Sequence, residues 1–201
     1  VSTLHSFMIP DDLPVGAYRI TSGLLYPNAP LIPADSETNL VLDNRVTVDW
    51  VKIAQEQPTI PDTAYPIDVV INEQFALTHI EFAVGADGIL LGQLHWRSLV
   101  DRPALDATIF VHIVDADGAI IAQSDSRPLN GTYPTFIWDN EEIVRTDHSF
   151  NFDDFESLDD YTIRIGMYIF PDAQNLPIRY QDRQYDDGLV MLDALSAYFT
   201  E

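Results

Sequence analysis

The sequence predicts an all-β protein of the β-sandwich class, with Greek-key or jelly-roll connections and an immunoglobulin-like layout. Three observations support this prediction. Short apolar runs rich in β-branched residues alternate with turn formers about every ten positions. No segment has the periodicity of an α-helix longer than a turn or two. Finally, residues 108–123 form two apolar runs joined across Asp117-Gly118, which predicts a β-hairpin.

The first arm of this hairpin, residues 109–114, is apolar on both faces. Such a strand is expected at the centre of a sheet, with a strand on either side and cover on both faces. We therefore expect a core that is built around the hairpin. The side chains expected in it are Trp96, Phe110, Val114, Ile120, Ile163 and Met167.

Further strands are expected on both sides of the hairpin, wherever apolar residues alternate between turn-forming stretches. The expected strands cover residues 4–9, 18–26, 46–53, 68–71, 77–84, 89–97, 144–152, 161–170 and 189–195. Residues 126–136 are rich in Pro, Gly and Asn, so we expect a long connection that crosses between sheets.

An internal repeat relates the two ends of the chain, with a period of about 143 residues. Residues 1–25 match residues 144–168, and after a one-residue slip the match continues to Asp49 and Asp193. The identical pairs include Val1/Val144, Thr3/Thr146, His5/His148, Ser6/Ser149, Phe7/Phe150, Tyr18/Tyr161, Ile20/Ile163, Gly23/Gly166 and Val46/Val190.

The repeat predicts how the chain is organised. Residues 1–54 are expected to be the C-terminal half of a first β-sandwich module, and residues 67–201 a complete module. Residues 55–66 contain three prolines and no periodicity, which is typical of a semi-rigid linker. Because the sequence begins with Val1 rather than Met, we interpret it as a processed product or as a fragment.

Composition excludes several functions. The formal net charge is −22, from 32 acidic and 10 basic residues, so the surface repels nucleic acid and anionic lipid. There is no cysteine, which excludes disulfides, thiol catalysis and thiolate metal sites. Every apolar run is shorter than the roughly 18 residues of a transmembrane helix. We therefore expect no nucleic-acid partner and no transmembrane segment.

Two groups of residues are candidates for ligand binding. Asp115 and Asp117 alternate before a glycine as in a calcium loop, but the oxygens that should follow are absent, so a hairpin turn is the alternative. Calcium is the only cofactor that this pattern suggests. Trp96, Tyr133 and Trp138 are candidates for an aromatic platform that stacks on sugar rings, with packing in the core as the alternative. No motif indicates a catalytic residue, so we expect no enzyme activity.

Four stretches together resemble a known family. They are residues 92–96, residues 110–118, residues 133–135 with Trp138 and Glu141-Glu142, and residues 161–168. They resemble extracytoplasmic β-sandwich modules of bacterial envelope proteins. Such modules often occur in tandem at the C-terminal end of glycosyltransferase-like membrane proteins, notably in Chloroflexi-like bacteria. The resemblance implies a β-sandwich and an extracellular or cell-surface location, and it transfers no catalytic residue.

Two functions are expected from this organisation. The first is a non-enzymatic structural or interaction module of the cell envelope. Its N-terminal half would be completed by strand complementation with subunits of the same or a related chain. The alternative is a carbohydrate-binding module attached to an envelope glycosyltransferase or glycosidase. Its partner would be a polysaccharide.

Overall fold

The computed structural model describes residues 6–23, 41–42, 45–85, 87–151 and 157–199. These residues form fourteen β-strands in three antiparallel sheets, with short 3-10 turns and no α-helix among them. The chain divides into two compact units, residues 1–54 and residues 55–201. The predicted all-β class is confirmed.

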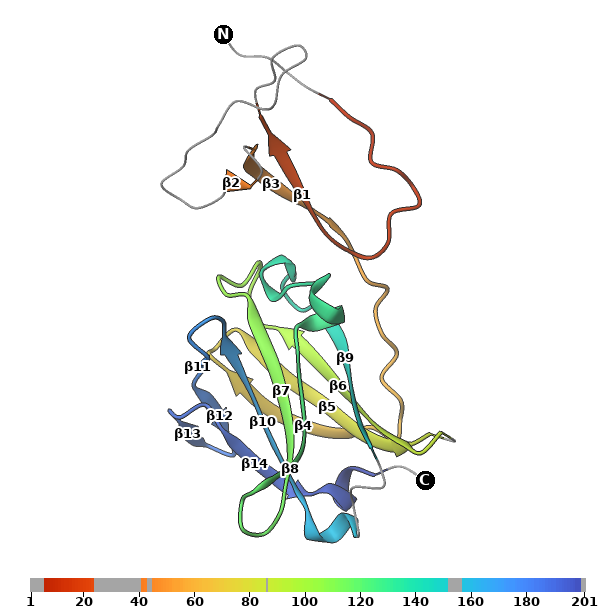
Figure 1. Cartoon of the computed structure of the whole chain (residues 1–201), viewed down its shortest axis with the longest axis vertical. Helices are drawn as coiled ribbons and strands as arrows, with labels where there is room; N and C mark the ends of the chain where they lie inside the picture. The colour runs from red at the N-terminus through yellow and green to blue at the C-terminus, as the bar shows by residue number, and fades with distance from the viewer. Residues whose placement is uncertain (1–5, 24–40, 43–44, 86, 152–156, 200–201) are drawn as a thin grey trace. The chain divides into compact units, whose positions relative to one another are not determined.

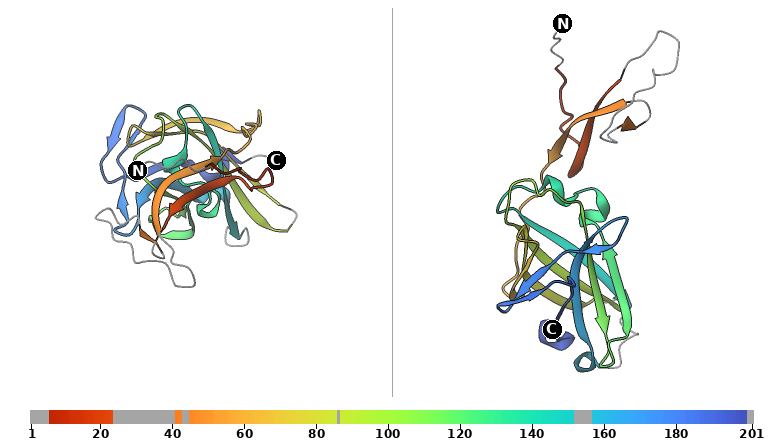
Figure 2. Two further views of the ribbon diagram at one scale, coloured as in Figure 1. Left: turned by 90° about the horizontal axis from the view of Figure 1, so that it is seen from above. Right: turned by 90° about the vertical axis from the view of Figure 1, so that its left-hand side faces the viewer.

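The second unit is a sandwich of two sheets (Figures 1 and 2). Its six-stranded sheet has the order β13-β12-β4-β5-β6-β9. These strands are β4 (Tyr65–Ile71), β5 (Phe75–Val84), β6 (Ile89–Ser98), β9 (Ile143–Asn151), β12 (Ile178–Tyr180) and β13 (Arg183–Tyr185).

The five-stranded sheet has the order β11-β10-β7-β8, and β14 also pairs with β10. These strands are β7 (Ala107–Val114), β8 (Ile120–Ser126), β10 (Thr162–Ile169), β11 (Gln174–Asn175) and β14 (Val190–Ala194). The predicted hairpin is therefore confirmed as β7 and β8. As expected, β7 lies inside the sheet, between β10 and β8.

Most of the core lies between the two sheets, whereas Phe110 is buried on the opposite face of β7, beside His112. Five of the six predicted core side chains are buried: Trp96, Phe110, Val114, Ile163 and Met167. The prediction that Ile120 belongs to the core is wrong, because its side chain is 44% exposed. It begins β8, the outermost strand of its sheet, directly after a register shift at Val114. The shift turns Ile120 away from the core, although its apolar side chain had suggested burial.

Residues 127–142 form the predicted connection, which runs from β8 of one sheet to β9 of the other. They contain two 3-10 turns, Pro128–Gly131 and Thr135–Ile137. Thr135 anchors the connection, because its hydroxyl accepts from the Ala107 N–H at 2.9 Å and donates to the Leu105 carbonyl. Two further 3-10 turns of the second unit lie at Leu158–Asp160 and Leu195–Tyr198.

The linker predicted over residues 55–66 belongs to the second unit. The Gln55 N–H donates to the Tyr133 hydroxyl at 3.3 Å, and Ala64 is buried. Tyr65 already pairs with Ile80 at the start of β4. Residues 55–66, for which the sequence predicted a semi-rigid linker, thus make contacts within the second unit.

The first unit has a three-stranded sheet of order β1-β3-β2, with β1 at Gly16–Ser22, β2 at Val41–Leu42 and β3 at Arg45–Ile53. The Tyr18 hydroxyl donates to the Pro14 carbonyl at 2.8 Å. A tyrosine that bonds backbone a few residues upstream of a strand is the tyrosine corner of immunoglobulin-like sandwiches. The strand predicted over residues 4–9 is not formed in residues 6–9, and residues 4–5 lie outside the described residues.

Candidate functional site

The two units share one structural element, a strand pair with the same register. Strands β1 and β3 of the first unit correspond in the repeat to β10 and β14 of the second. Residues that the repeat aligns face each other in both units. The aligned cross-strand pairs are Arg19↔Trp50 with Thr162↔Ala194, Thr21↔Thr47 with Arg164↔Met191, and Ser22↔Val46 with Ile165↔Val190.

A bulge interrupts both strand pairs at the same place. The register shifts between Ile20 and Thr21 in the first unit, and between Thr162 and Arg164, which align with Arg19 and Thr21, in the second. A β-bulge depends on particular local geometry and is not expected twice by chance at aligned positions. The sequence repeat is therefore also a repeat of structure.

The other edge of this element differs between the units. In the second unit β10 pairs along its whole length with β7, from Thr162↔Val114 to Ile169↔Ala107. In the first unit, β3 is the only strand of the described residues that pairs with β1. The edge of β1 that corresponds to the β7-paired edge of β10 thus carries backbone N–H and C=O groups that no described strand satisfies.

Side chains that are buried in the complete module are exposed in the first unit. Phe7 is 65% exposed, whereas its counterpart Phe150 is 4% exposed. Val48 is 64% exposed, whereas the aligned Leu192 is 6% exposed. The sequence identified the repeat but could not assign these exposures, because burial depends on strands far away in the chain.

The apolar residues around Phe7 surround a groove of about 140 Å³. Its lining includes Met8, Ile9, Leu13 and Ile20 from the segment before β1 and from β1 itself. Met8 is 94% exposed and Ile9 is 43% exposed. We call the free edge of β1, together with the exposed side chains Phe7, Met8 and Ile9 beside it, the open face of the first unit. The open face therefore offers a partner apolar side chains and backbone hydrogen-bonding groups.

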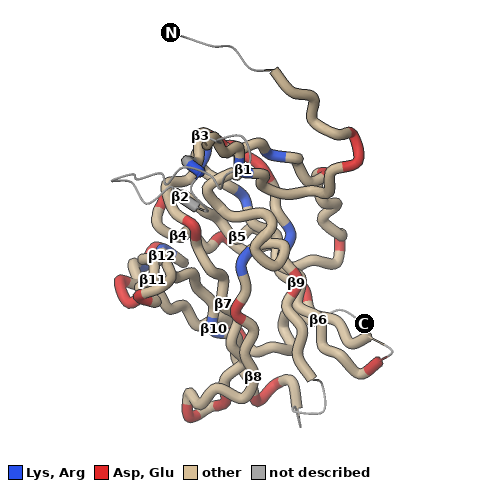
Figure 3. Tube along the Cα trace, turned by 45° about the horizontal axis from the view of Figure 1, so that its top comes forward, with Lys and Arg blue, Asp and Glu red and all other residues tan. Residues whose placement is uncertain are grey.

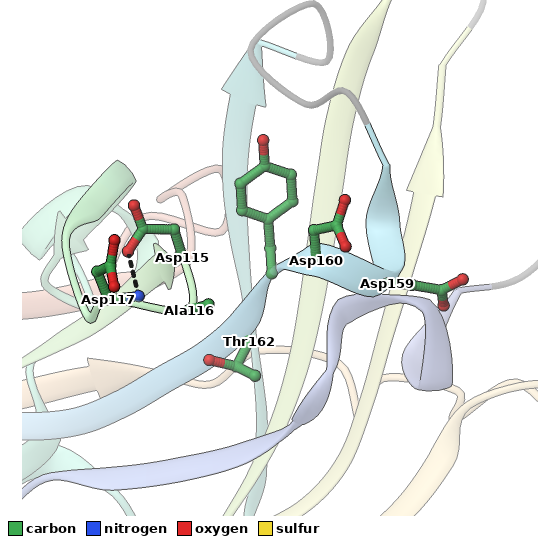
Figure 4. Close-up of a pocket in the computed structure, with 7 residues that line it drawn as sticks. Asp115, Ala116, Asp117, Asp159, Asp160 and Thr162 are labelled. Carbon is green, nitrogen blue, oxygen red and sulfur yellow. Dashed lines mark hydrogen bonds between the residues drawn. The ribbon is translucent and has the colours of Figure 1, made fainter.

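The predicted calcium residues line a pocket of about 480 Å³ at one end of the second unit (Figure 4). Asp115 and Asp117 come from the β7–β8 loop, and Asp159 and Asp160 from the turn before β10. Asp115 Oδ1 accepts the backbone N–H groups of Asp117 at 3.0 Å and of Ala119 at 2.8 Å. Its carboxylate thus closes the hairpin loop, as the turn alternative predicts.

These four carboxylates do not converge. In Figure 4, Asp159 points away from Asp115 and Asp117. No group of three or more potential ligands in the described residues is arranged to hold a metal ion. A calcium site at Asp115 and Asp117 stays a prediction.

The predicted sugar platform is wrong. Trp96, Tyr133 and Trp138 are each 0% exposed, and an aromatic face must be open to stack on a sugar ring. Trp138 packs edge-to-face on Phe75 at 5.7 Å and donates its indole N–H to the Tyr133 carbonyl at 3.2 Å. The alternative of core packing holds for all three.

A buried polar cluster joins the two sheets of the second unit. Thr146 Oγ1 accepts from Trp96 Nε1 at 3.0 Å and lies 3.2 Å from His148 Nε2, while His148 Nδ1 lies 3.1 Å from Ser124 Oγ on β8. Burial lowers the pKa of His148 to about 4, so the imidazole is neutral at pH 7. Burial and the nearby His79 also lower the pKa of His95.

A second polar group lies on the outer face of the five-stranded sheet. His112 Nε2 lies 3.0 Å from Asp125 Oδ1, and Arg164 Nη2 lies 3.0 Å from His112 Nδ1. Because Arg164 can only donate, Nδ1 accepts and the Nε2 proton is directed at Asp125. The three residues form a cross-strand ladder over β8, β7 and β10.

Acidic residues dominate the charge of the chain. Many of them lie in loops, such as the loop between β7 and β8 (Figure 3). Others lie on strands, such as Asp125 on β8, next to His112, and Asp147 on β9, which forms an ion pair with Arg145. Among the described residues, no helix has the length and apolar character needed to cross a bilayer.

Comparison with known proteins adds little. No family model and no curated protein matches the chain. Among solved structures, the chain is similar to the variable domain of the AgI/II polypeptide BspA of Streptococcus agalactiae. The match has 11% sequence identity, covers 78% of this chain and 91% of that chain, and has a TM-score of 0.19.

Proposed function

We propose that this chain is a non-enzymatic structural and interaction module of the cell envelope, located outside the cytoplasmic membrane. Its second unit is a finished β-sandwich, and its first unit joins it to other subunits by strand complementation. The resemblance to envelope modules supports the location. The open face supports the mode of interaction.

The observation that carries this proposal is the contrast between two copies of one element. The same strand pair, with the same register and bulge, is covered in the second unit and uncovered in the first. Exposed strand edges next to apolar side chains favour pairing with another chain. Addition of a strand there would satisfy the backbone N–H and C=O groups on the free edge of β1.

Sedimentation velocity tests this function. The intact chain is expected to associate as its concentration rises, because the open face is free to contact other copies. Ile9→Asp places a charge on that face and should abolish association. Ile120→Asp is the matched control, because Ile120 is an isoleucine of similar exposure that lies on β8 of the second unit. A monomeric intact chain at every concentration, or equal behaviour of the two variants, would contradict the proposal.

The location has its own test. Protease added to intact source cells should cleave a module that lies outside the membrane before the cells are lysed. Cleavage only after lysis would place the chain in the cytoplasm and contradict this part of the proposal.

A further inference from the structure

The complete module contains the strand that covers the counterpart of the open face, and that strand is β7. In the second unit β7 lies antiparallel to β10, and the side chains of β10 that face the core are buried against the first half of the module. Since β1 repeats β10 in sequence, in pairing and in its bulge, the structure assigns an occupant to the free edge of β1. This inference rests on the proposed function and specifies its partner.

We propose that β1 binds a polypeptide segment of the same type as β4–β8, which we call a first-half segment, through an antiparallel strand equivalent to β7. The register follows from the repeat. In the second unit Ile163 faces Ile113 and Gly166 faces Phe110. The aligned residues of the first unit are Ile20 and Gly23. The partner strand therefore places an apolar β-branched residue opposite Ile20 and an aromatic residue opposite Gly23.

The glycine makes this register specific. A Cβ on Gly166 would lie 2.3 Å from the Phe110 ring and 2.5 Å from the Gly188 carbonyl oxygen, so only glycine leaves room for both. Phe110 is 2% exposed and lies 4.9 Å from His112 and 6.3 Å from Tyr168, between ring centroids. The repeat retains glycine at position 23, the place where a β7-type aromatic residue would lie.

The described residues contain two strand pairs of the second-half type, β1 with β3 and β10 with β14, and one first half, β4–β8. A second copy of these residues alone is therefore not a sufficient partner. If one copy gave its first half to the open face of another, its own β9 and β10 would lose their partners. Identical copies can touch through their open faces, but they cannot complete every half.

The test uses the repeat itself. Residues 55–143 are duplicated directly ahead of Val1, so that Ile143 joins Val1 as it joins Val144 in the natural module. The expected result is that amide exchange across β1 slows by at least roughly 100-fold, as for a strand that becomes central in a sheet. The longer chain should also sediment as a monomer.

Two changes confined to the duplicated copy test the register. Phe110→Ala should make amide exchange in β1 faster again. At least roughly a tenth of the exchange rate that the duplication removed should be regained, because the space opposite Gly23 is then unfilled. Ile121→Ala is the matched control and should leave β1 protected, because Ile121 is 39% exposed. Equal protection of β1 in both variants would overturn the assigned register.

A separate measurement covers the case in which the duplicated copy does not fold. A peptide of residues 105–116, which spans β7, is added to the intact chain, and exchange of β1 is followed. Protection of β1 supports the proposal. If neither the duplication nor the peptide protects β1, the proposal is wrong. If the intact chain alone protects β1 as fully as β10 at high concentration, a second copy is the partner, and only the first-half assignment fails.

Discussion

Lowering the pH should destabilise the second unit through His148. This side chain is 0% exposed, and burial lowers its pKa from 6.5 to about 4. Between these two values the unfolded chain binds a proton that the folded chain does not bind. The free energy of unfolding therefore falls as the pH falls from 7 towards 4. With about 1.4 kcal/mol per pKa unit, the full loss from His148 is about 3 kcal/mol.

Urea unfolding followed by tryptophan fluorescence measures this loss, because Trp96 and Trp138 are buried in the same core. His148→Gln is the control, since a glutamine amide can still bond the Ser124 and Thr146 hydroxyls but does not titrate. Subtracting the pH profile of the variant's free energy of unfolding removes the contributions of the carboxylates and of His95, because both proteins contain these groups. If the two profiles fall in parallel between pH 7 and pH 4.5, His148 is not the buried neutral group described above.

Three further predictions concern packing and charge. Ile163→Ala should lower the free energy of unfolding by about 2–5 kcal/mol, because Ile163 is fully buried. Ile120→Ala should lower it by less than about 1 kcal/mol, because Ile120 is exposed. Equal losses of stability in denaturant unfolding would contradict the placement of the core. Gly166→Ala should cost at least about 1–3 kcal/mol because its Cβ would meet the Gly188 carbonyl oxygen, and a neutral effect in the same assay would argue against the close approach. The melting temperature should rise with sodium chloride, because screening reduces repulsion within a chain of net charge −22; a melting temperature independent of both sodium and calcium salts would remove this role of the acidic excess.

Local sequence patterns predicted the centre of the fold well. The run 109–114 is apolar on both faces, and a strand of this kind has few places to lie other than inside a sheet. The turn at Asp117-Gly118 then fixed β8 beside β7. Ile120 escaped this reasoning because its exposure follows from a register shift and from the position of β8 at the sheet edge.

Contacts between distant residues explain the other differences. Residues 6–9 have the alternation of a strand, as does their counterpart in β9, but β9 is a strand because it pairs with β6. The first unit has no equivalent of β6 among its described residues. The sequence left both a core position and an exposed platform open for Trp96 and Trp138, and the packing of the folded module buries both.

Only part of the candidate site could be predicted from the sequence. The repeat pointed to residues 1–54 as a half-module, and that alone suggested a missing partner. The shared bulge, the free edge of β1 and the role of Gly23 needed the paired registers of both units. An aligned glycine in a sequence does not reveal which aromatic ring it leaves room for.

Amide hydrogen exchange along β1 and β10 in the intact, dilute chain tests the central claim most directly. In a strand with one paired edge, N–H groups directed at the neighbour are protected and the alternate N–H groups are not. We predict this alternation in Gly16–Ser22 and uniform protection in Thr162–Ile169, which has neighbours on both edges. Uniform protection of β1 at a concentration where the chain is monomeric would mean that its edge is already occupied, and would contradict the open face.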